Sequence, residues 1–207
     1  MCQLKLKQVG AAFSLALAAL AAQAADATFA GQLIYDTDVV RIDFTLANAS
    51  SVDFWTDSWQ AGLNFDPTLS MFDASGHLIA TGDDTPDLAA LHSGQGGYDS
   101  DIAATLGAGH YILTLSASGN DPLGPTLADG FSLAGTSPIL VGDWNQPSYD
   151  INKNDQKGGF WELRLSGIDS ASVVPEPAQV LAMLGGLALL AIRRKRKARV
   201  GRARPHV

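Results

Sequence analysis

The strongest constraint on the fold is a period-two alternation of large apolar residues in the central part of the chain. In the stretch VVRIDFTL, residues 39–46, every second side chain is apolar: Val40, Ile42, Phe44 and Leu46. Successive side chains of a strand point to opposite faces of a sheet, so this spacing predicts a strand with one buried face. No stretch of about ten residues between positions 26 and 172 repeats with the helical period. The sequence therefore indicates an all-β domain.

Further strands are predicted by the same alternation. They cover residues 51–59, two short segments within 68–81, and residues 110–118 and 159–168. The segment 68–81 turns at Asp73–Gly76, which has the composition of a hairpin loop. Roughly seven to nine short strands, separated by Gly, Pro, Asn and Asp, predict a single β-sandwich.

The first 24 residues have the order of features found in a secretory signal peptide. Lys5 and Lys7 precede an apolar run over residues 9–22, and the small residues of AQA end at Ala24. We expect signal peptidase to cleave after Ala24. Cys2 is the single cysteine of the chain, so it is removed with this segment and the exported part forms no disulfide.

The charge of the chain is unevenly distributed. Residues 25–174 hold all but one of the 21 acidic residues and only four of the 14 Lys and Arg residues. Such an acidic domain repels nucleic acid. It is typical of a surface protein, or of a protein that binds divalent cations.

The C-terminal end divides into three segments. Residues 173–177 are predicted to be an extended linker, because Pro175 and Pro177 flank Glu176. Residues 178–192 are almost entirely apolar and would form a helix of about 22 Å, a short transmembrane span. Residues 193–207 are basic and are expected to stay in the cytoplasm. The alternative for the apolar segment is a buried helix.

This order of segments resembles a known signal. The motif Pro175-Glu176-Pro177, the short apolar span and the basic run RRKRK are similar to the PEP-CTERM sorting signal of Gram-negative bacteria. The resemblance implies that an exosortase recognises the tail and removes it. The protein would be anchored transiently in the inner membrane and then released to the cell surface or extracellular matrix. The tail differs in running on to Val207.

The predicted sandwich resembles a second family. The stretches DVVRIDFTL, FDPTLSMFDASGHLIATGDD and YDSDIAATLGAGHYILTLSASGN are similar to bacterial pre-peptidase C-terminal (PPC) domains, and LADGF and FWELRLSGI to a PPC-like group found in PEP-CTERM proteins. The resemblance covers residues 38–168, with Met71 and His110 as variants. It implies a jelly-roll-like β-sandwich over residues 25–172, acting as an accessory or matrix module without a known active site.

Two groups of residues are candidate binding sites. Carboxylates near the predicted strand ends offer the oxygen ligands that Ca²⁺ prefers: Asp73, Asp83, Asp84, Asp99 and Asp101. The alternative is that they are solvated turn residues. Trp55 and Trp59 share strand parity with Asp53 and Asp57, so they would stack a sugar if that face were open. The alternative is core or rim packing.

Catalytic motifs are poorly represented. His77, His92 and His110 are not spaced as a zinc-binding pair, and no G-x-S-x-G motif occurs. The sequence therefore predicts a non-catalytic exported surface or matrix protein associated with exopolysaccharide or biofilm. One alternative is a carbohydrate- or calcium-binding adhesin module, and a third is a secreted hydrolase.

Overall fold

A computed structural model describes residues 25–85, 92, 97–146 and 158–175. The predicted signal peptide, Glu176, Pro177, the apolar segment 178–192 and the basic tail lie outside the described residues. Within those described residues, none of the helices is long and apolar enough to cross a membrane.

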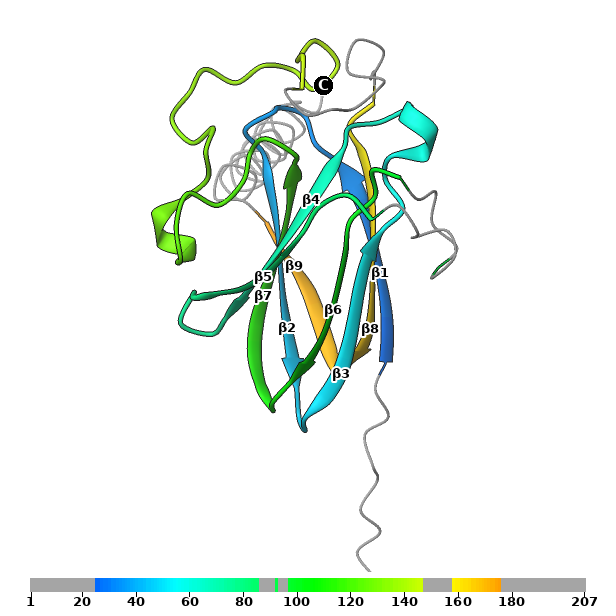
Figure 1. Cartoon of the computed structure of the whole chain (residues 1–207), viewed down its shortest axis with the longest axis vertical. Coiled ribbons are helices and arrows are strands. Elements are labelled where there is room, and N and C mark those ends of the chain that lie inside the picture. Colours follow the sequence, from blue (N-terminus) through cyan, green and yellow to red (C-terminus); the bar gives the residue numbers. More distant parts are fainter. Residues whose placement is uncertain (1–24, 86–91, 93–96, 147–157, 176–207) are drawn as a thin grey trace, which may run out of the picture.

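Two antiparallel sheets form the described part of the chain (Figure 1). The smaller sheet has the order β1 (Ala25–Gln32), β8 (Phe160–Ile168), β3 (Ser50–Thr56), β6 (Asp101–Leu106). The larger sheet has the order β5 (Leu78–Gly82), β4 (Pro67–Asp73), β7 (Gly109–Ala117), β2 (Val39–Leu46), β9 (Ser170–Val174). The prediction of an all-β sandwich is confirmed by this arrangement.

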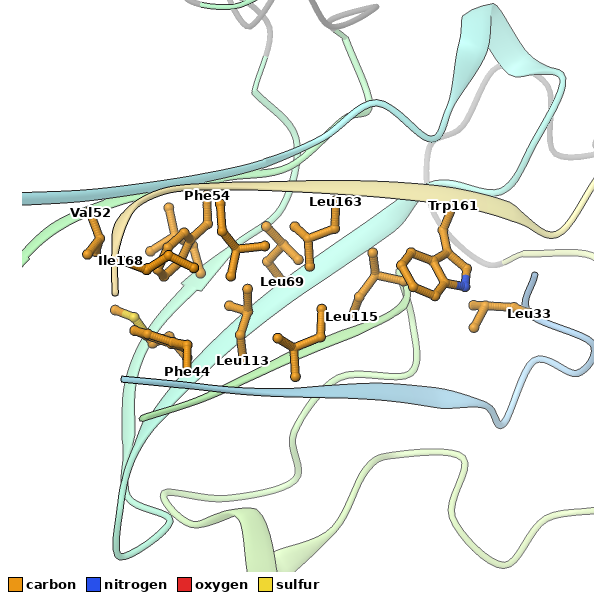
Figure 2. Close-up of a cluster of buried hydrophobic side chains, with 14 of the residues drawn as sticks. Leu33, Phe44, Val52, Phe54, Leu69, Leu113, Leu115, Trp161, Leu163 and Ile168 are labelled. Atoms are coloured by element: carbon orange, nitrogen blue, oxygen red, sulfur yellow. The ribbon is translucent and has the colours of Figure 1, made fainter. Parts of the chain in front are cut away.

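The core lies between the two sheets and follows the alternation seen in the sequence (Figure 2). From β2, Phe44 points inward and meets Phe54 of β3 edge-to-face, with ring centroids 4.9 Å apart. From β8, Trp161, Leu163 and Leu165 point toward the same core. Burying each such side chain stabilises the fold by about 1.5–3 kcal/mol. The apolar face therefore fixes which side of each strand is exposed, and the functional residues occupy the other side.

Four strands differ from the prediction. β3 ends at Thr56, because residues 60–62 form the 3₁₀ turn η1 (Gln60–Gly62) and Trp59 caps it. β1 and β6 were not among the predicted strands, because they contain several alanines and their apolar alternation is weak. β9 extends through Val174 and pairs with β2, so the sheet continues two residues past the predicted end of the domain at residue 172.

The two sheets meet at one end through a close backbone contact. A Cβ atom placed on Gly82, the last residue of β5, would collide with the carbonyl of Asp101, the first residue of β6. Just beyond, Asp84 pairs with Ser100 in an isolated antiparallel bridge. The absence of a side chain at Gly82 therefore allows the start of β6 to lie against the end of β5, and this junction positions two of the acidic groups below.

Candidate functional site

Three ionisable side chains and one indole meet on the outer face of the smaller sheet. On β3, Val52 and Phe54 point into the core, so Asp53 and Trp55 point outward. On β6, Ile102 is buried, which directs Asp101 to the same outer face. The register places Trp55 opposite Asp101. Asp53 and Asp101 therefore lie diagonally across neighbouring strands, within reach of one another.

His92 completes this group. Its Nε2 lies 3.3 Å from Asp53 Oδ2 and 3.8 Å from Asp101 Oδ2. Its ring is stacked on Trp55, with centroids 3.9 Å apart and ring planes 6° apart. We call Asp53, His92 and Asp101 the outer-face triad. The side chains of His92 and Asp101 are 14% and 13% exposed, whereas that of Asp53 is 38% exposed.

The carboxylates of the outer-face triad are only partly satisfied. Asp53 Oδ1 and Asp101 Oδ1 are buried and have no hydrogen-bond partner within the described part of the chain. Burial raises the pKa of Asp101 to about 6, with further increases from the charge of Asp53 and from a hydrogen bond between the two carboxyl groups. The His92 imidazole acts in the opposite direction. Asp101 therefore binds a proton more readily than a solvated aspartate does.

A second acidic group lies where β4 begins and β5 ends, at the opposite end of these strands from their hairpin. Asp66 is buried, Asp83 and Asp84 are exposed, and each offers an oxygen within 4.8 Å of the others. Thr68 Oγ1 donates to Asp83 Oδ1 at 3.0 Å. The pKa of Asp121 is raised, first by burial and then by the charge of Asp83. We call Asp66, Asp83 and Asp84 the junction cluster.

The backbone of the junction cluster is fixed by a buried amide. Gln146 Nε2 donates to the carbonyl of Asp66 at 2.8 Å, and the Asp66 amide donates to Gln146 Oε1 at 3.1 Å. Gln146 also donates to the carbonyl of Ser118 at 2.9 Å. Gln146 thus holds the Asp66 backbone at the start of β4.

The five aspartates predicted to bind calcium are divided among four places. Asp83 and Asp84 belong to the junction cluster, and Asp101 belongs to the outer-face triad. Asp99 is fully buried, and its Oδ1 accepts hydrogen bonds from Thr56 Oγ1, the Ser58 amide and the Trp59 amide. Burial is the main cause that raises the pKa of Asp99.

Asp73 lies elsewhere, in the hairpin between β4 and β5. Its Oδ1 accepts from the Ser75 hydroxyl at 2.6 Å and from the amides of Ser75 and His77. These bonds, the Ser75 hydroxyl first, lower the pKa of Asp73. Asp73 therefore stabilises a turn. It lies apart from each of the other four predicted calcium ligands.

The two candidate sugar-binding tryptophans have neighbours of their own. One face of Trp55 is covered by His92. Trp59 lies beside Tyr98 in a tilted contact, with centroids 5.0 Å apart. The indole nitrogens of both are buried without a hydrogen-bond partner among the described residues. The two rings therefore do not form a bare aromatic platform.

The residues of the outer-face triad differ in how well the sequence predicts their positions. The position of Asp101 at the start of a strand was visible in the sequence, and so was the outward parity of Asp53. His92 was noted as an isolated histidine, because no residue at a metal-binding spacing accompanies it. Its contact with Asp53 depends on the path of the chain between β5 and β6.

Pro175, the first residue of the predicted sorting motif, is the last described residue. It is exposed and follows β9 directly. The remaining two motif residues lie outside the described part.

Comparison with known proteins gives little further information. No protein family and no curated protein matches this sequence. Among solved structures, the chain is similar to the pre-peptidase C-terminal domain of a collagenase from Bacillus anthracis, with 15% identity and a TM-score of 0.39. The match covers 68% of this chain and 88% of that domain. The β-sandwich architecture rests on the sheet order and register described above.

Proposed function

We propose that this chain is an exported, non-catalytic protein of the cell surface or extracellular matrix, sorted by its C-terminal tail. In this proposal signal peptidase removes residues 1–24, and an exosortase removes the apolar segment and the basic tail. The resemblance of residues 38–168 to PPC-like domains favours an accessory role. Exopolysaccharide is the partner that this location implies.

The observation that carries this proposal is the position of Pro175. The larger sheet ends with β9, whose last residue is Val174, and Pro175 follows at once and is exposed. Among the described strands β9 is at the edge of its sheet and pairs with β2. The Pro-Glu-Pro motif therefore begins directly outside the folded domain, where a processing enzyme can bind extended backbone without unfolding the sandwich.

The contacts of Ser75 and His77 favour a role without catalysis for this pair. Ser75 Oγ lies 2.7 Å from His77 Nδ1, but the pair is in the exposed β4–β5 hairpin. The same hydroxyl also donates to Asp73, and the amides of Ser75 and His77 donate to that carboxylate as well. A serine nucleophile needs a free hydroxyl and unoccupied amide donors for the oxyanion. Here the Asp73 carboxylate accepts hydrogen bonds from the Ser75 hydroxyl and from both amides, so neither the hydroxyl nor the amides are available.

The test is the intact mass of the protein isolated from a Gram-negative host that carries an exosortase. We expect the parent to lack residues 1–24 and the tail after the motif. The double variant Pro175→Ala, Glu176→Ala should retain the tail, whereas Ser172→Ala on β9 should be processed like the parent. A parent protein whose mass includes residues 178–207 would contradict the proposal.

The junction cluster favours one alternative, a calcium-binding adhesin module. Asp66, Asp83 and Asp84 supply three carboxylates at one end of the sandwich. Calcium needs six to eight oxygen ligands, which waters and backbone carbonyls can complete. This alternative shares the exported location and differs in requiring calcium for full stability.

A further inference from the structure

We propose that the outer-face triad of Asp53, His92 and Asp101 is a binding site for a first-row divalent metal ion, with Zn²⁺ as the best fit. The three residues come from β3, from the connection between β5 and β6, and from β6. Their potential ligand atoms all lie within 4.8 Å of one another. This site is separate from the junction cluster, and it does not depend on the proposed route of export.

The distances suit a small tetrahedral ion. Zinc binds imidazole nitrogen and carboxylate oxygen at about 2.0–2.2 Å, so two ligands on a tetrahedron lie about 3.3–3.6 Å apart. His92 Nε2 is 3.3 Å from Asp53 Oδ2 and 3.8 Å from Asp101 Oδ2. The first distance already falls in this range, and the Asp101 oxygen would have to approach His92 by a few tenths of an ångström to reach it. Water would occupy the fourth corner, as in zinc sites with three protein ligands.

The unsatisfied oxygens are an independent observation that points to a cation. Asp53 Oδ1 and Asp101 Oδ1 are removed from solvent and lack hydrogen-bond partners within the described part of the chain. Buried carboxylate oxygens without partners are costly, and an uncompensated pair repel each other as well. His92 lies near the Oδ2 atoms, and a single imidazolium carries only one positive charge for the two carboxylates. A divalent ion neutralises both carboxylates at once.

The donor set selects the metal. An imidazole nitrogen with two carboxylates suits Zn²⁺ and its neighbours in the first transition row, whereas Ca²⁺ and Mg²⁺ prefer oxygen ligands alone. Trp55 covers one face of the His92 ring, which fixes the plane of the imidazole. A metal bound here would tie residue 92 to β3 and β6.

The test uses the full, untagged chain after removal of metals with a chelator. Isothermal titration with ZnCl₂ should give one saturable site in the parent. His92→Gln and Asp101→Asn should each weaken Zn²⁺ binding by about tenfold or more. The control is His110→Gln, because His110 is exposed on the other sheet, and this variant should bind like the parent.

A spectroscopic measurement keeps the proposal testable if a variant fails to fold. Cu²⁺ loaded into the parent should give an electron paramagnetic resonance spectrum with splitting from a single imidazole nitrogen. The splitting should vanish in His92→Gln and persist in His110→Gln. The proposal is overturned if the parent shows no saturable Zn²⁺ binding, if its Cu²⁺ spectrum lacks nitrogen splitting, or if His92→Gln binds zinc like the parent. Displacement of zinc by an equal concentration of Ca²⁺ would also overturn it.

Discussion

The imidazole of His92 lies flat on the indole of Trp55, with ring centroids 3.9 Å apart and planes 6° apart. Both rings sit above the outer face of the smaller sheet. Trp55 covers a face of the imidazole and not its edge. Nε2 lies on that edge, close to Asp53 and Asp101. The orientation of His92 is therefore set by a neighbour that is not itself a metal ligand.

This stack gives the first prediction. Trp55→Leu should weaken Zn²⁺ binding by about two- to tenfold, because aromatic pairs contribute ~0.5–1.5 kcal/mol beyond their buried area. Trp55→Phe keeps an aromatic face and should bind within about twofold of the parent. Titration of both variants with ZnCl₂ is the measurement. Equal affinity of the Leu and Phe variants would show that the stack does not position His92.

The second prediction concerns the stability of the metal-free protein as a function of pH. The pKa of Asp101 in the folded state is raised to about 6 from 3.8, chiefly by burial and then by Asp53. The folded state then binds more protons than the unfolded state between these values, so the free energy of unfolding falls as pH rises from about 4 to about 6. Solvent screening limits the loss from this group to ~1 kcal/mol.

Asp101→Asn isolates this contribution from the other acids. The variant cannot ionise at this position, so its stability should fall less steeply than that of the parent over the same pH range. Urea unfolding in the presence of a chelator measures both curves. Parallel curves for parent and variant would mean that Asp101 ionises as readily in the folded state as in the unfolded chain.

The third prediction concerns calcium at the junction cluster. Millimolar Ca²⁺ should raise the melting temperature by roughly 5–10 °C, since an ion at a hundredfold excess over its Kd stabilises the folded state by about 2.7 kcal/mol. NaCl at matched ionic strength should do much less. Asp84→Asn should remove most of the difference, and Asp143→Asn, at an exposed position, should not. Equal responses to the two salts would reduce the cluster to a solvated acidic surface.

The fourth prediction concerns the buried carboxylate of Asp99. Asp99→Ala removes the acceptor of three hydrogen bonds and should lower the free energy of unfolding by about 3 kcal/mol. Asp99→Asn keeps a carbonyl oxygen and carries no charge. Because burial already raises the pKa of Asp99, the neutral amide should be tolerated within about 1 kcal/mol at neutral pH. Chemical denaturation distinguishes the two, and equal losses would indicate that the charge itself is required.

The fifth prediction compares two glycines with the same backbone requirement. Gly167 and Gly135 have φ values of +81° and +83°. A Cβ on Gly167 would collide with the carbonyl of Ser51, whereas nothing lies within 4 Å of a Cβ on Gly135. Gly135→Ala should cost about 1–2 kcal/mol for the left-handed backbone alone, and Gly167→Ala clearly more. Similar melting temperatures for the two variants would mean that β3 and β8 readily separate at this point.

The sequence predicted the fold where one face of a strand is apolar. The alternation around Phe44 and Leu163 identified β2 and β8, since every second residue must enter the core. It did not identify β9, whose residues SASVV include three small side chains. The pairing of β9 with β2 comes from the chain reversal at Asp169, whose carboxylate accepts from the Ala47 amide, and local pattern carries no information on such a contact.

The candidate sites were harder to predict than the strands, because they also depend on contacts between residues far apart in the sequence. Asp84 and Ser100 pair just beyond the end of β5 and before the start of β6. The direction of each acidic side chain depends on where β5 ends and β6 begins, which the sequence pattern does not define. Parity on β6 directs Asp101 toward Asp53 of β3, whereas Asp83 and Asp84 follow the last residue of β5 and lie near Asp66. A single histidine such as His92 gives no spacing from which its partners can be inferred.

The pairing of β1 with β8 has a consequence for the order in which the molecule can assemble. Phe29 of β1 lies opposite Leu163 of β8. β1 therefore pairs with a strand that is separated from it by most of the domain sequence. Closing so long a loop is slow, because its entropy is lost before the new contacts form. During synthesis from the N-terminus, β1 therefore stays unpaired for most of the time. The smaller sheet is completed only after β8 has been made.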